Sequence, residues 1–294
     1  MNIFEFLQLD KTLINDTDID QEYSTFFILK HDGKSKRRID APSKLLKTWQ
    51  RIILDNLLYK FTTNTIAHGF VKERSPRTNA YVHIQKKLII KTDIQDFFPS
   101  LTYEKVATTL RRLIGQLKDV KYADSDIDLL TKVLCLKGVL PQGAPTSPAM
   151  ANLICADFDI ELNNLGQEFN CEITRYADDI TVSMGDNSHV KQLVNAIYAL
   201  MKKYDLKPNY KKLKIFSNAT RQEVTGVVVN EKLNAPKSLW RPIRVRLHQL
   251  QGKELDAESA RRLRGQIEWI RSLNPNRGNR FLQDFKNIII KDQI

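Results

Sequence analysis

Cysteine is scarce in this 294-residue sequence and is never clustered. The three cysteines form no CxxC pair and lie within apolar segments, at Cys135, Cys155 and Cys171. Without paired spacing, neither a disulfide framework nor a zinc site is expected. We predict that they are core thiols in a protein of a reducing compartment.

Long apolar stretches are also absent. No run approaches the roughly 18 residues that a membrane-spanning helix needs, and the first residues lack the basic region of a secretory signal. Internal repeats and low-complexity tracts are missing as well. We therefore predict a cytoplasmic protein with no membrane partner. Its length is sufficient for one large domain or about two to three subdomains.

Acidic residues are outnumbered, because 34 Asp and Glu face 46 Lys and Arg, which gives a net charge of +12. This excess indicates a polyanionic partner, either nucleic acid or an acidic membrane surface. Residues 231–294 hold 14 Lys and Arg against 7 Asp and Glu, a net of +7. There Arg241, Arg244 and Arg246 lie near Trp240, which favours a surface that binds a nucleic-acid backbone. A solvated helical tail would show similar charge.

The spacing of apolar residues predicts a mixture of helices and strands. Helices are expected at residues 43–61, 102–114, 126–136, 148–165 and 189–204. Strands are expected at residues 23–28, 86–93, 171–176, 180–184, 213–216 and 224–229. The rest of the chain after this last strand is expected to be helical.

Two adjacent aspartates, Asp178 and Asp179, interrupt the strand-like stretch TRYADDITVS. If strands flank them, they form a two-residue hairpin loop, where Asn-Gly or Asp-Gly is favoured because positive φ is needed. Asp-Asp adds backbone strain and like-charge repulsion. A bound divalent cation would offset both, and an exposed acidic turn is the alternative.

A second carboxylate, Asp93, ends the apolar stretch KKLIIKTD, 85 residues before Asp178. An unpaired charge there would be costly, so we expect it to converge with the YADD aspartates on Mg²⁺. Two such ions about 4 Å apart activate a hydroxyl and stabilise a leaving pyrophosphate, as polymerases require. Asp96 is assigned a surface or turn role.

The stretch LKGVLPQGAPTSPAM has glycines at the spacing of a phosphate-binding P-loop, Gly138 and Gly143. However, Ala144-Pro145 replaces the expected Lys and Ser or Thr, and prolines remove amides that would cradle phosphate. We interpret it as a rigid loop that presents Gln142 to a ligand, although such loops are more often only structural.

Taken together, these stretches resemble the motifs of reverse transcriptases. Asp93 in DIQDFF, Gln142 in LPQGAPTSP, YADD and NYKKLKI are similar to motifs A, B, C and D in order and approximate spacing. In addition, NAYVH (Asn79–His83) and Val224-Thr225-Gly226 resemble the NAxxH and VTG signatures of bacterial retron reverse transcriptases.

The resemblance implies an α+β fold with the right-hand polymerase architecture. Fingers with an N-terminal segment would occupy residues 1–85 together with part of 100–140. The palm, an antiparallel sheet with helices and motifs A to D, would occupy mainly 86–230, and a basic helical thumb 231–294. The implied activity is that of an RNA-directed DNA polymerase that uses deoxynucleoside triphosphates and two Mg²⁺ ions, with Mn²⁺ as a possible substitute.

The same resemblance assigns the catalytic and metal-binding residues. Asp93 and Asp178 would be the principal metal ligands, assisted by Asp179, with the carbonyl of Ile94 as a further oxygen. All three aspartates would be catalytic.

Four residues would bind the incoming nucleotide. Phe98 would be the steric gate against a 2′-hydroxyl, and Gln142 would contact the nucleotide. Lys212 would lie near the pyrophosphate, with Lys211 and Lys214 as alternatives in register. Arg37 would hold the triphosphate, because its guanidinium fork suits phosphate oxygens; Lys36 or Arg38 could do this instead.

The retron signatures would bind RNA, through Asn79, His83, Val224, Thr225 and Gly226, and the arginines at 241, 244 and 246 would add backbone contacts. Purely structural roles stay open for these signatures. A single histidine near a strand is usually structural, and Thr225-Gly226 could be a bulge or a packing contact.

Retron membership further implies a cognate noncoding RNA, primed from a guanosine 2′-hydroxyl, and a branched RNA–DNA product. It also implies antiphage defence with an effector protein, and a host RNase H for template removal. Two alternatives remain. One is another bacterial reverse transcriptase, of the group II intron or diversity-generating type, and the other is a non-catalytic RNA-binding scaffold.

Overall fold

A five-stranded antiparallel sheet forms the middle of the protein, seen in a computed structural model that describes residues 1–29, 33, 35–186 and 188–291. Its strands are β3 (Leu88–Gln95), β4 (Glu172–Tyr176), β5 (Asp179–Met184), β6 (Lys207–Pro208) and β7 (Lys214–Ser217). The order is β4-β5-β3-β6, and β7 also pairs with β3, along Leu88–Lys91, whereas β6 pairs with Ile94 and Gln95. The central strand β3 is almost wholly buried, as its apolar run requires.

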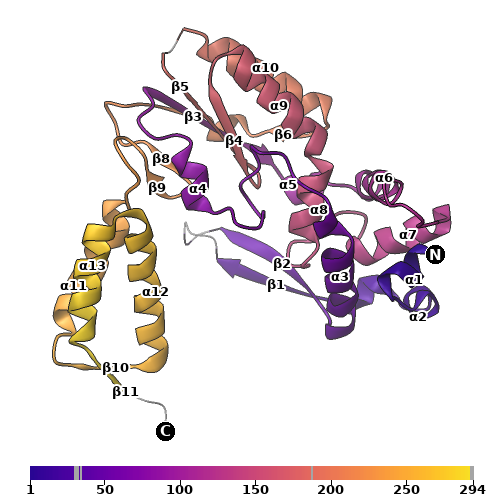
Figure 1. The fold of residues 1–294 in the computed structure, drawn as a ribbon, viewed down its shortest axis with the longest axis horizontal. Coiled ribbons are helices and arrows are strands. Elements are labelled where there is room, and N and C mark those ends of the chain that lie inside the picture. Colours follow the sequence, from indigo (N-terminus) through magenta and orange to yellow (C-terminus); the bar gives the residue numbers. More distant parts are fainter. Residues whose placement is uncertain (30–32, 34, 187, 292–294) are drawn as a thin grey trace.

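Two helices pack near the sheet, α9 (Ala156–Glu168) and α10 (Val190–Lys203) (Figure 1). The buried residues of α10 recur every three or four positions and include Leu193, Ile197 and Leu200. This spacing places them on one helical face, which is the reason that α10 can cover an apolar surface.

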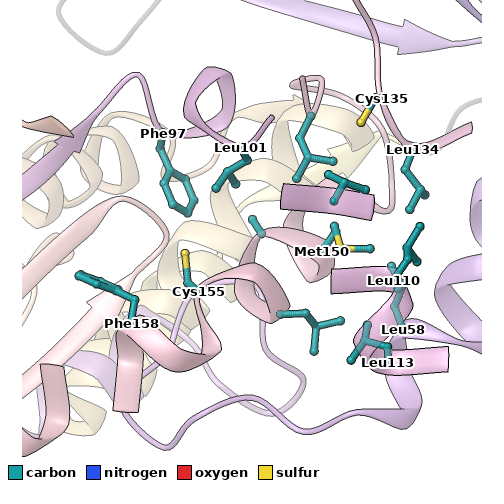
Figure 2. Packing of buried hydrophobic residues seen from close by; sticks show 14 of the residues in the cluster. Leu58, Phe97, Leu101, Leu110, Leu113, Leu134, Cys135, Met150, Cys155 and Phe158 are labelled. Atoms are coloured by element: carbon teal, nitrogen blue, oxygen red, sulfur yellow. The ribbon is translucent and has the colours of Figure 1, made fainter. Parts of the chain in front are cut away.

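A helical layer continues the same core toward the N-terminus. It contains α1 (Ile3–Leu7), α2 (Lys11–Asn15), α3 (Lys44–Asn56), α6 (Tyr103–Ile114), α7 (Asp124–Leu134) and α8 (Ser147–Ile154), with short 3-10 turns at Ile19–Glu22 and Leu58–Lys60. Figure 2 shows Leu110, Leu113 and Met150 packed together in this layer, with Phe158 of α9 in the same cluster. One continuous core therefore joins these helices to the sheet.

A two-stranded ribbon, β1 (Tyr23–Leu29) and β2 (Lys36–Pro42), extends from this core. It pairs with no further strand in the described chain, and most of its residues are exposed. Its base is fixed because the amide of Asp40 donates to the carbonyl of Gln142 at 2.8 Å. The ribbon is thus anchored to the PQG loop while its two faces stay open.

A second core holds the C-terminal part of the chain. Its helices are α4 (Pro76–Tyr81), α11 (Lys237–Gln249), α12 (Ala257–Leu273) and α13 (Pro275–Lys286), and its strands are the hairpin β8 (Glu223–Val224)–β9 (Val227–Val228) and the parallel pair β10 (Glu254–Asp256)–β11 (Ile289–Lys291). Helices α11 to α13 stand apart from the sheet as a separate bundle (Figure 1). Ala80 of α4 and Ile89 of β3 belong to this core, so it reaches back to the sheet.

Several expected elements differ from the observed ones. The helix expected at 148–165 is broken at Cys155 into α8 and α9, and the strand expected at 224–229 is the hairpin β8–β9. The short helices α1, α2 and α4 were not expected. Cys135 and Cys155 are buried as expected, whereas Cys171 is only half-buried. No helix in the described part of the chain is long and apolar enough to cross a membrane.

Candidate active site

The turn between β4 and β5 is displaced by one residue from the expected position. Tyr176 pairs with Asp179, so the two loop residues are Ala177 and Asp178, and the prediction of an Asp178-Asp179 loop is wrong. Ala177 takes the left-handed conformation, with φ of +57°. An alanine costs roughly 1 kcal/mol there, so neighbouring contacts must hold the turn.

This turn brings the three predicted catalytic aspartates together. Asp93 lies opposite Asp179 in the β3–β5 register, and the amide of Ile94 donates to the carbonyl of Asp178 at 3.0 Å. Strand β3 continues past Asp93 to Gln95, so Asp93 lies within the strand and is only 1% exposed. Two neighbouring strands therefore present the carboxylates at one end of the sheet.

The cluster carries more negative charge than its surroundings compensate. Desolvation, followed by repulsion from Asp93, raises the pKa of Asp178. Desolvation and then the charge of Asp178 raise the pKa of Asp179 to about 6. Asp179 itself keeps contact with solvent, so water screens part of this repulsion.

One cation already lies at the cluster. Lys212, at the end of the 3-10 turn Tyr210–Lys212, donates a hydrogen bond from Nζ to Asp93 Oδ2, which raises the pKa of the lysine. Lys214 lies in β7 opposite Lys91 of β3. Of the alternatives left open in register, Lys212 is thus the lysine that the structure brings to Asp93.

The donor set fits a Mg²⁺ site. Oδ1 of Asp93 is buried without a hydrogen-bond partner in the described part of the chain, which leaves an oxygen free for a hard cation. In the described part of the chain, no three His, Cys, Asp or Glu side chains are placed so that they could hold a metal ion by themselves. Mg²⁺ commonly binds one or two carboxylates and completes its shell with substrate phosphates and water, so no such set of three is needed.

The arginines of β2 divide between two roles. Arg38 donates from Nε to Asp40 at 2.8 Å, and Asp40 also accepts from Thr25. The side chain of Arg37, the preceding residue in the strand, has no hydrogen bond or ion pair with another described residue, and its charge partly opposes the rise that desolvation causes in the pKa of Asp178. Among the described residues, the Arg37 side chain is therefore a cation without a fixed partner on this side of the site, and so is that of Lys36.

The PQG loop is held against β2 through its backbone. Gly143 has φ of +140°, and a Cβ at this position would lie 2.4 Å from the carbonyl oxygen of Asp40. Only glycine permits both the conformation and this close approach. The side chain of the preceding Gln142 is half-buried, and its nucleotide contact stays a prediction.

Phe97 and Phe98 separate into core and surface roles. Asp96, with φ of +50°, makes the turn that begins the short helix α5 (Phe97–Ser100), in agreement with its expected turn role. Phe97 is 5% exposed and belongs to the core, whereas Phe98 is half-buried and contacts the edge of Phe97 with ring centroids 5.5 Å apart. Phe98 is thus the ring available to a ligand, and its role as steric gate stays a prediction.

A buried charge network behind the turn was missed by sequence reasoning. Arg175 of β4 is fully buried and donates to both carboxylate oxygens of Asp159, each at 2.6 Å. It also donates to the carbonyl of Ala177 and to Oδ1 of Asn152, both at 3.0 Å. These bonds hold the strained Ala177 in place. The available signal was an arginine within the otherwise apolar strand sequence ITRY.

The match to protein-family models covers most of these elements. Residues 28–229 match the family described as reverse transcriptase (RNA-dependent DNA polymerase). The chain is 33% identical to the retron Ec86 reverse transcriptase of Escherichia coli over 86% of this chain and 77% of that one. The chain belongs to the retron reverse transcriptases. Members of this family are RNA-directed DNA polymerases.

Further comparisons agree with the fold. Two retron reverse transcriptases of Myxococcus xanthus, Mx162 and Mx65, are 31% and 33% identical over 91% and 88% of this chain, but the match covers only 61% and 63% of their own length. Among solved structures, a telomerase from Candida albicans matches 88% of this chain and 54% of that one, with a TM-score of 0.53 and 12% identity. Apo telomerase from Candida tropicalis gives a TM-score of 0.51 at 11% identity, over 92% and 58%. The right-hand polymerase fold expected from the sequence is confirmed.

The NAxxH signature of this retron reverse transcriptase points inward. His83 is fully buried, with Nδ1 2.7 Å from Ser183 Oγ and Nε2 2.8 Å from Thr174 Oγ1. Burial lowers the pKa of His83 to about 3, so the ring is neutral. Asn79 is 1% exposed. Neither side chain reaches the surface in this structure, and the expectation that the region around them binds RNA stays a prediction.

The VTG signature forms the tight turn of the hairpin β8–β9. Thr225 and Gly226 have φ of +45° and +80°, as a two-residue hairpin turn requires. Thr225 Oγ1 donates to the carbonyl of Pro76 at 2.9 Å and accepts from Asn79 Nδ2 at 3.4 Å. Val224 is buried. The two signatures thus contact each other, and RNA binding by the turn stays a prediction.

The predicted backbone-binding arginines lie on α11. Arg241 and Arg244 approach the ring of Trp240, at 5.9 and 5.6 Å from its centroid, and Arg277 of α13 approaches it at 4.4 Å. Arg246 is exposed on the same helix. An indole surrounded by three guanidiniums makes a basic and partly apolar surface, which suits stacked bases and phosphates.

Proposed function

We propose that this retron reverse transcriptase synthesises msDNA, a branched single-stranded DNA linked to RNA, from a cognate structured noncoding RNA. Synthesis would begin at a guanosine 2′-hydroxyl of that RNA and use deoxynucleoside triphosphates. The single observation that carries the proposal is the meeting of Asp93, Asp178 and Asp179 around a buried, unpartnered carboxylate oxygen, in a chain whose relatives are retron reverse transcriptases. We further propose antiphage defence with an effector protein, in the cytoplasm, with host RNase H removing template.

In this proposal Asp93 and Asp178 bind two Mg²⁺ ions, or Mn²⁺ in their place, with Asp179 assisting and the carbonyl of Ile94 as a further oxygen. When bound, the ions lower the pKa of the attacking hydroxyl and stabilise charge on the leaving pyrophosphate. Lys212 holds a proton near the site, because its hydrogen bond to Asp93 raises its pKa, and it would be the proton donor to the leaving pyrophosphate.

The remaining nucleotide-binding residues orient the substrate. Arg37 binds the triphosphate with a guanidinium that has no other described partner, and Gln142 contacts the nucleotide from a loop pinned to β2. Phe98 excludes a 2′-hydroxyl with its half-buried ring. Positioning of this kind supplies most of the catalysis expected for phosphoryl transfer.

RNA would be bound by two separate features. The basic surface around Trp240 with Arg241, Arg244 and Arg246 contacts the backbone, which makes binding strongly salt-dependent. The VTG turn contacts the cognate RNA through its backbone and exposed atoms, while Asn79 and His83 support it from behind. In this proposal the turn contacts the RNA and the two buried side chains hold the turn in position, which is why they can belong to an RNA-binding signature without reaching the surface.

The test is to express the gene with its native flanking DNA and analyse the nucleic acid that co-purifies with the protein, with and without RNase. The Asp178→Ala/Asp179→Ala variant serves as the matched control. A small DNA of fixed length whose mobility rises after RNase, and which the variant lacks, is the expected result. RNA alone with both proteins would favour a non-catalytic scaffold, and no discrete nucleic acid would favour a generic reverse transcriptase.

A further inference from the structure

A loop segment, residues 66–70, is fastened along the free edge of β4. The amide of Arg175 donates to the carbonyl of Ile66 at 2.8 Å, and the amide of His68 donates to the carbonyl of Arg175 at 2.7 Å. Arg74 also donates to the carbonyls of Asn64 and Thr65, each at 2.9 Å. The segment is therefore fixed to the strand that leads into the catalytic turn.

Gly69 brings this segment directly onto the catalytic turn. A Cβ at Gly69 would lie 2.4 Å from the amide nitrogen of Ala177, so any side chain there would collide with backbone. Asn152, which also accepts from Arg175, donates to the carbonyl of Gly69 at 2.9 Å. The position of the next residue, Phe70, is thus set by the same network that holds the aspartate turn.

Phe70 combines two unfavourable features. Its φ of +61° is left-handed, which is rare for a bulky residue, and its side chain is 45% exposed. Backbone strain that persists at a fixed position commonly marks a functional site. The ring lies 6.3 Å from that of Phe98, at an interplanar angle of 51°, within the range of favourable aromatic pairs.

We propose that Phe70 is a specificity-determining positioning residue that holds the ring of Phe98 against the sugar of the incoming nucleotide. This inference rests on the proposed role of Phe98 as steric gate and deepens it. Phe97 contacts Phe98 by its edge, and Phe70 supplies a second ring contact. Together, the two ring contacts keep Phe98 from moving away from the sugar. A nucleotide with a 2′-hydroxyl would then be excluded, so the enzyme would select deoxynucleotides.

Space around Phe70 makes the proposal testable without loss of the fold. Phe70 lines a cavity of about 580 Å³ together with Tyr59 and Ala149, among others. Because nearly half of Phe70 is exposed beside this cavity, Phe70→Ala removes fewer buried contacts than truncation of a core ring would. Tyr59→Ala is the matched control, since it removes an exposed ring from the same cavity, and Tyr59 has no ring contact with Phe98 among the described residues.

The experiment measures kcat/KM for dTTP and for UTP on an RNA template with a DNA primer, using the full chain. Phe70→Ala should lower the dTTP preference about fivefold, the size expected from one lost aromatic pair, while kcat for dTTP stays within about threefold. Phe70→Tyr should keep the preference, because the ring is retained. Tyr59→Ala should leave it unchanged.

Phe98→Ala and the double variant separate the possible failures. Phe98→Ala should relax the preference further, and adding Phe70→Ala should then have little effect, because the two act as one unit. An unchanged preference in Phe70→Ala beside a relaxed one in Phe98→Ala would overturn the proposal alone. Independent, additive effects would show that Phe70 does not act through Phe98. If neither Phe70→Ala nor Phe98→Ala changed the dTTP preference, Phe98 would not be the steric gate, and the proposal for Phe70 would be refuted as well.

Discussion

Asp93 and Asp159 are both buried acids beside the same hairpin, yet their charges are neutralised in different ways. Asp159 accepts from two nitrogens of Arg175, a side chain that is itself fully buried. Asp93 accepts on one oxygen from Lys212, whose side chain is 61% exposed, and its other oxygen has no partner in the described chain. The buried partner of Asp159 gives this carboxylate a structural role. The exposed lysine beside Asp93 can move away, which leaves the Asp93 carboxylate able to bind a metal ion.

The electrostatics of the two clusters follow from this difference. Burial raises the pKa of Asp159 and opposes the charge of Arg175, whereas the attraction between the two raises the pKa of Arg175. The two hydrogen bonds at 2.6 Å keep the pair closed. At the catalytic cluster, desolvation and mutual repulsion raise the pKa of Asp178 and Asp179. The closed pair therefore fixes the turn, and the open cluster, which has only Lys212 beside it, would be stabilised further by a bound cation.

The largest expected effect comes from the open cluster. Asp178→Asn should lower polymerisation about 1000-fold or more, because it removes a ligand on which metal-dependent transfer depends. Thermal stability without metal should stay equal or rise, since the raised pKa means that the carboxylate is unfavourable there. Primer extension and a melting curve measure the two. The exposed Asp55→Asn should change neither, and a large loss of stability in Asp178→Asn would contradict the comparison.

The closed pair should respond in the opposite way. Arg175→Met leaves Asp159 buried and uncompensated, which should cost about 3–5 kcal/mol in the free energy of unfolding. Arg175→Met with Asp159→Leu should regain most of that loss, because the stranded charge is gone. Denaturant unfolding measures both variants.

Activity then separates packing from positioning in the same pair. The double variant still lacks the donor to the carbonyl of Ala177, so its polymerisation should remain about 10-fold below wild type in primer extension. If the double variant recovers activity together with stability, the pair does not position the catalytic turn.

The same contrast explains what the sequence could and could not predict. Helix α6 is predicted within one residue, because Thr102 caps it and its apolar residues recur at helical spacing. The break at Cys155 is not predicted, since the apolar pattern continues across it and neither Pro nor Gly marks it. Local signals specify elements, and nonlocal packing decides where a long one divides.

The site shows the same limit. Asp93, Asp178 and Asp179 are predictable because charges in apolar strands need an explanation. The displaced turn is not predictable, since Ala177 adopts a conformation that its own sequence disfavours. Gly69 contacts Ala177 from a distant segment, and Arg175, two residues earlier in β4, is itself held by the distant Asp159 and Asn152. The motif predicts the ligands, whereas tertiary contacts set which residue makes the turn.

His83 is buried with both ring nitrogens in hydrogen bonds, and it should make the stability of the fold depend on pH. Its pKa is lowered to about 3 by burial, against about 6.5 when unfolded. Above pH 6.5 the His83 ring is neutral in both the folded and the unfolded protein, and its contribution to stability is fully present. Between pH 6.5 and about pH 3 only the unfolded protein binds a proton at this ring. The free energy of unfolding should therefore fall by about 1.4 kcal/mol per pH unit, or about 2 kcal/mol by pH 5.

His83→Asn is the variant that isolates this effect. It should be less stable at pH 7, where it loses bonds to Ser183 and Thr174, but its stability should fall less between pH 7 and pH 5. His68, whose pKa burial lowers to about 4, contributes in the same direction and is present in both proteins. Denaturant unfolding at both pH values is the measurement, and an unchanged pH slope would refute the assignment.

The smallest expected effect contrasts two neighbouring arginines of β2. Arg37→Ala should raise KM for deoxynucleotides about tenfold, as expected for losing one charge-assisted contact to phosphate. Arg38→Ala should leave KM nearly unchanged and cost about 1 kcal/mol in stability, because Arg38 itself is half-exposed and the buried Asp40 keeps its hydrogen bond from Thr25. Steady-state kinetics with both variants measures this. A larger rise in KM for Arg38→Ala than for Arg37→Ala would assign triphosphate binding to Arg38 instead. Arg38 would then leave Asp40 when the triphosphate binds. In that case, an ion pair in the free protein does not by itself show that a side chain is structural.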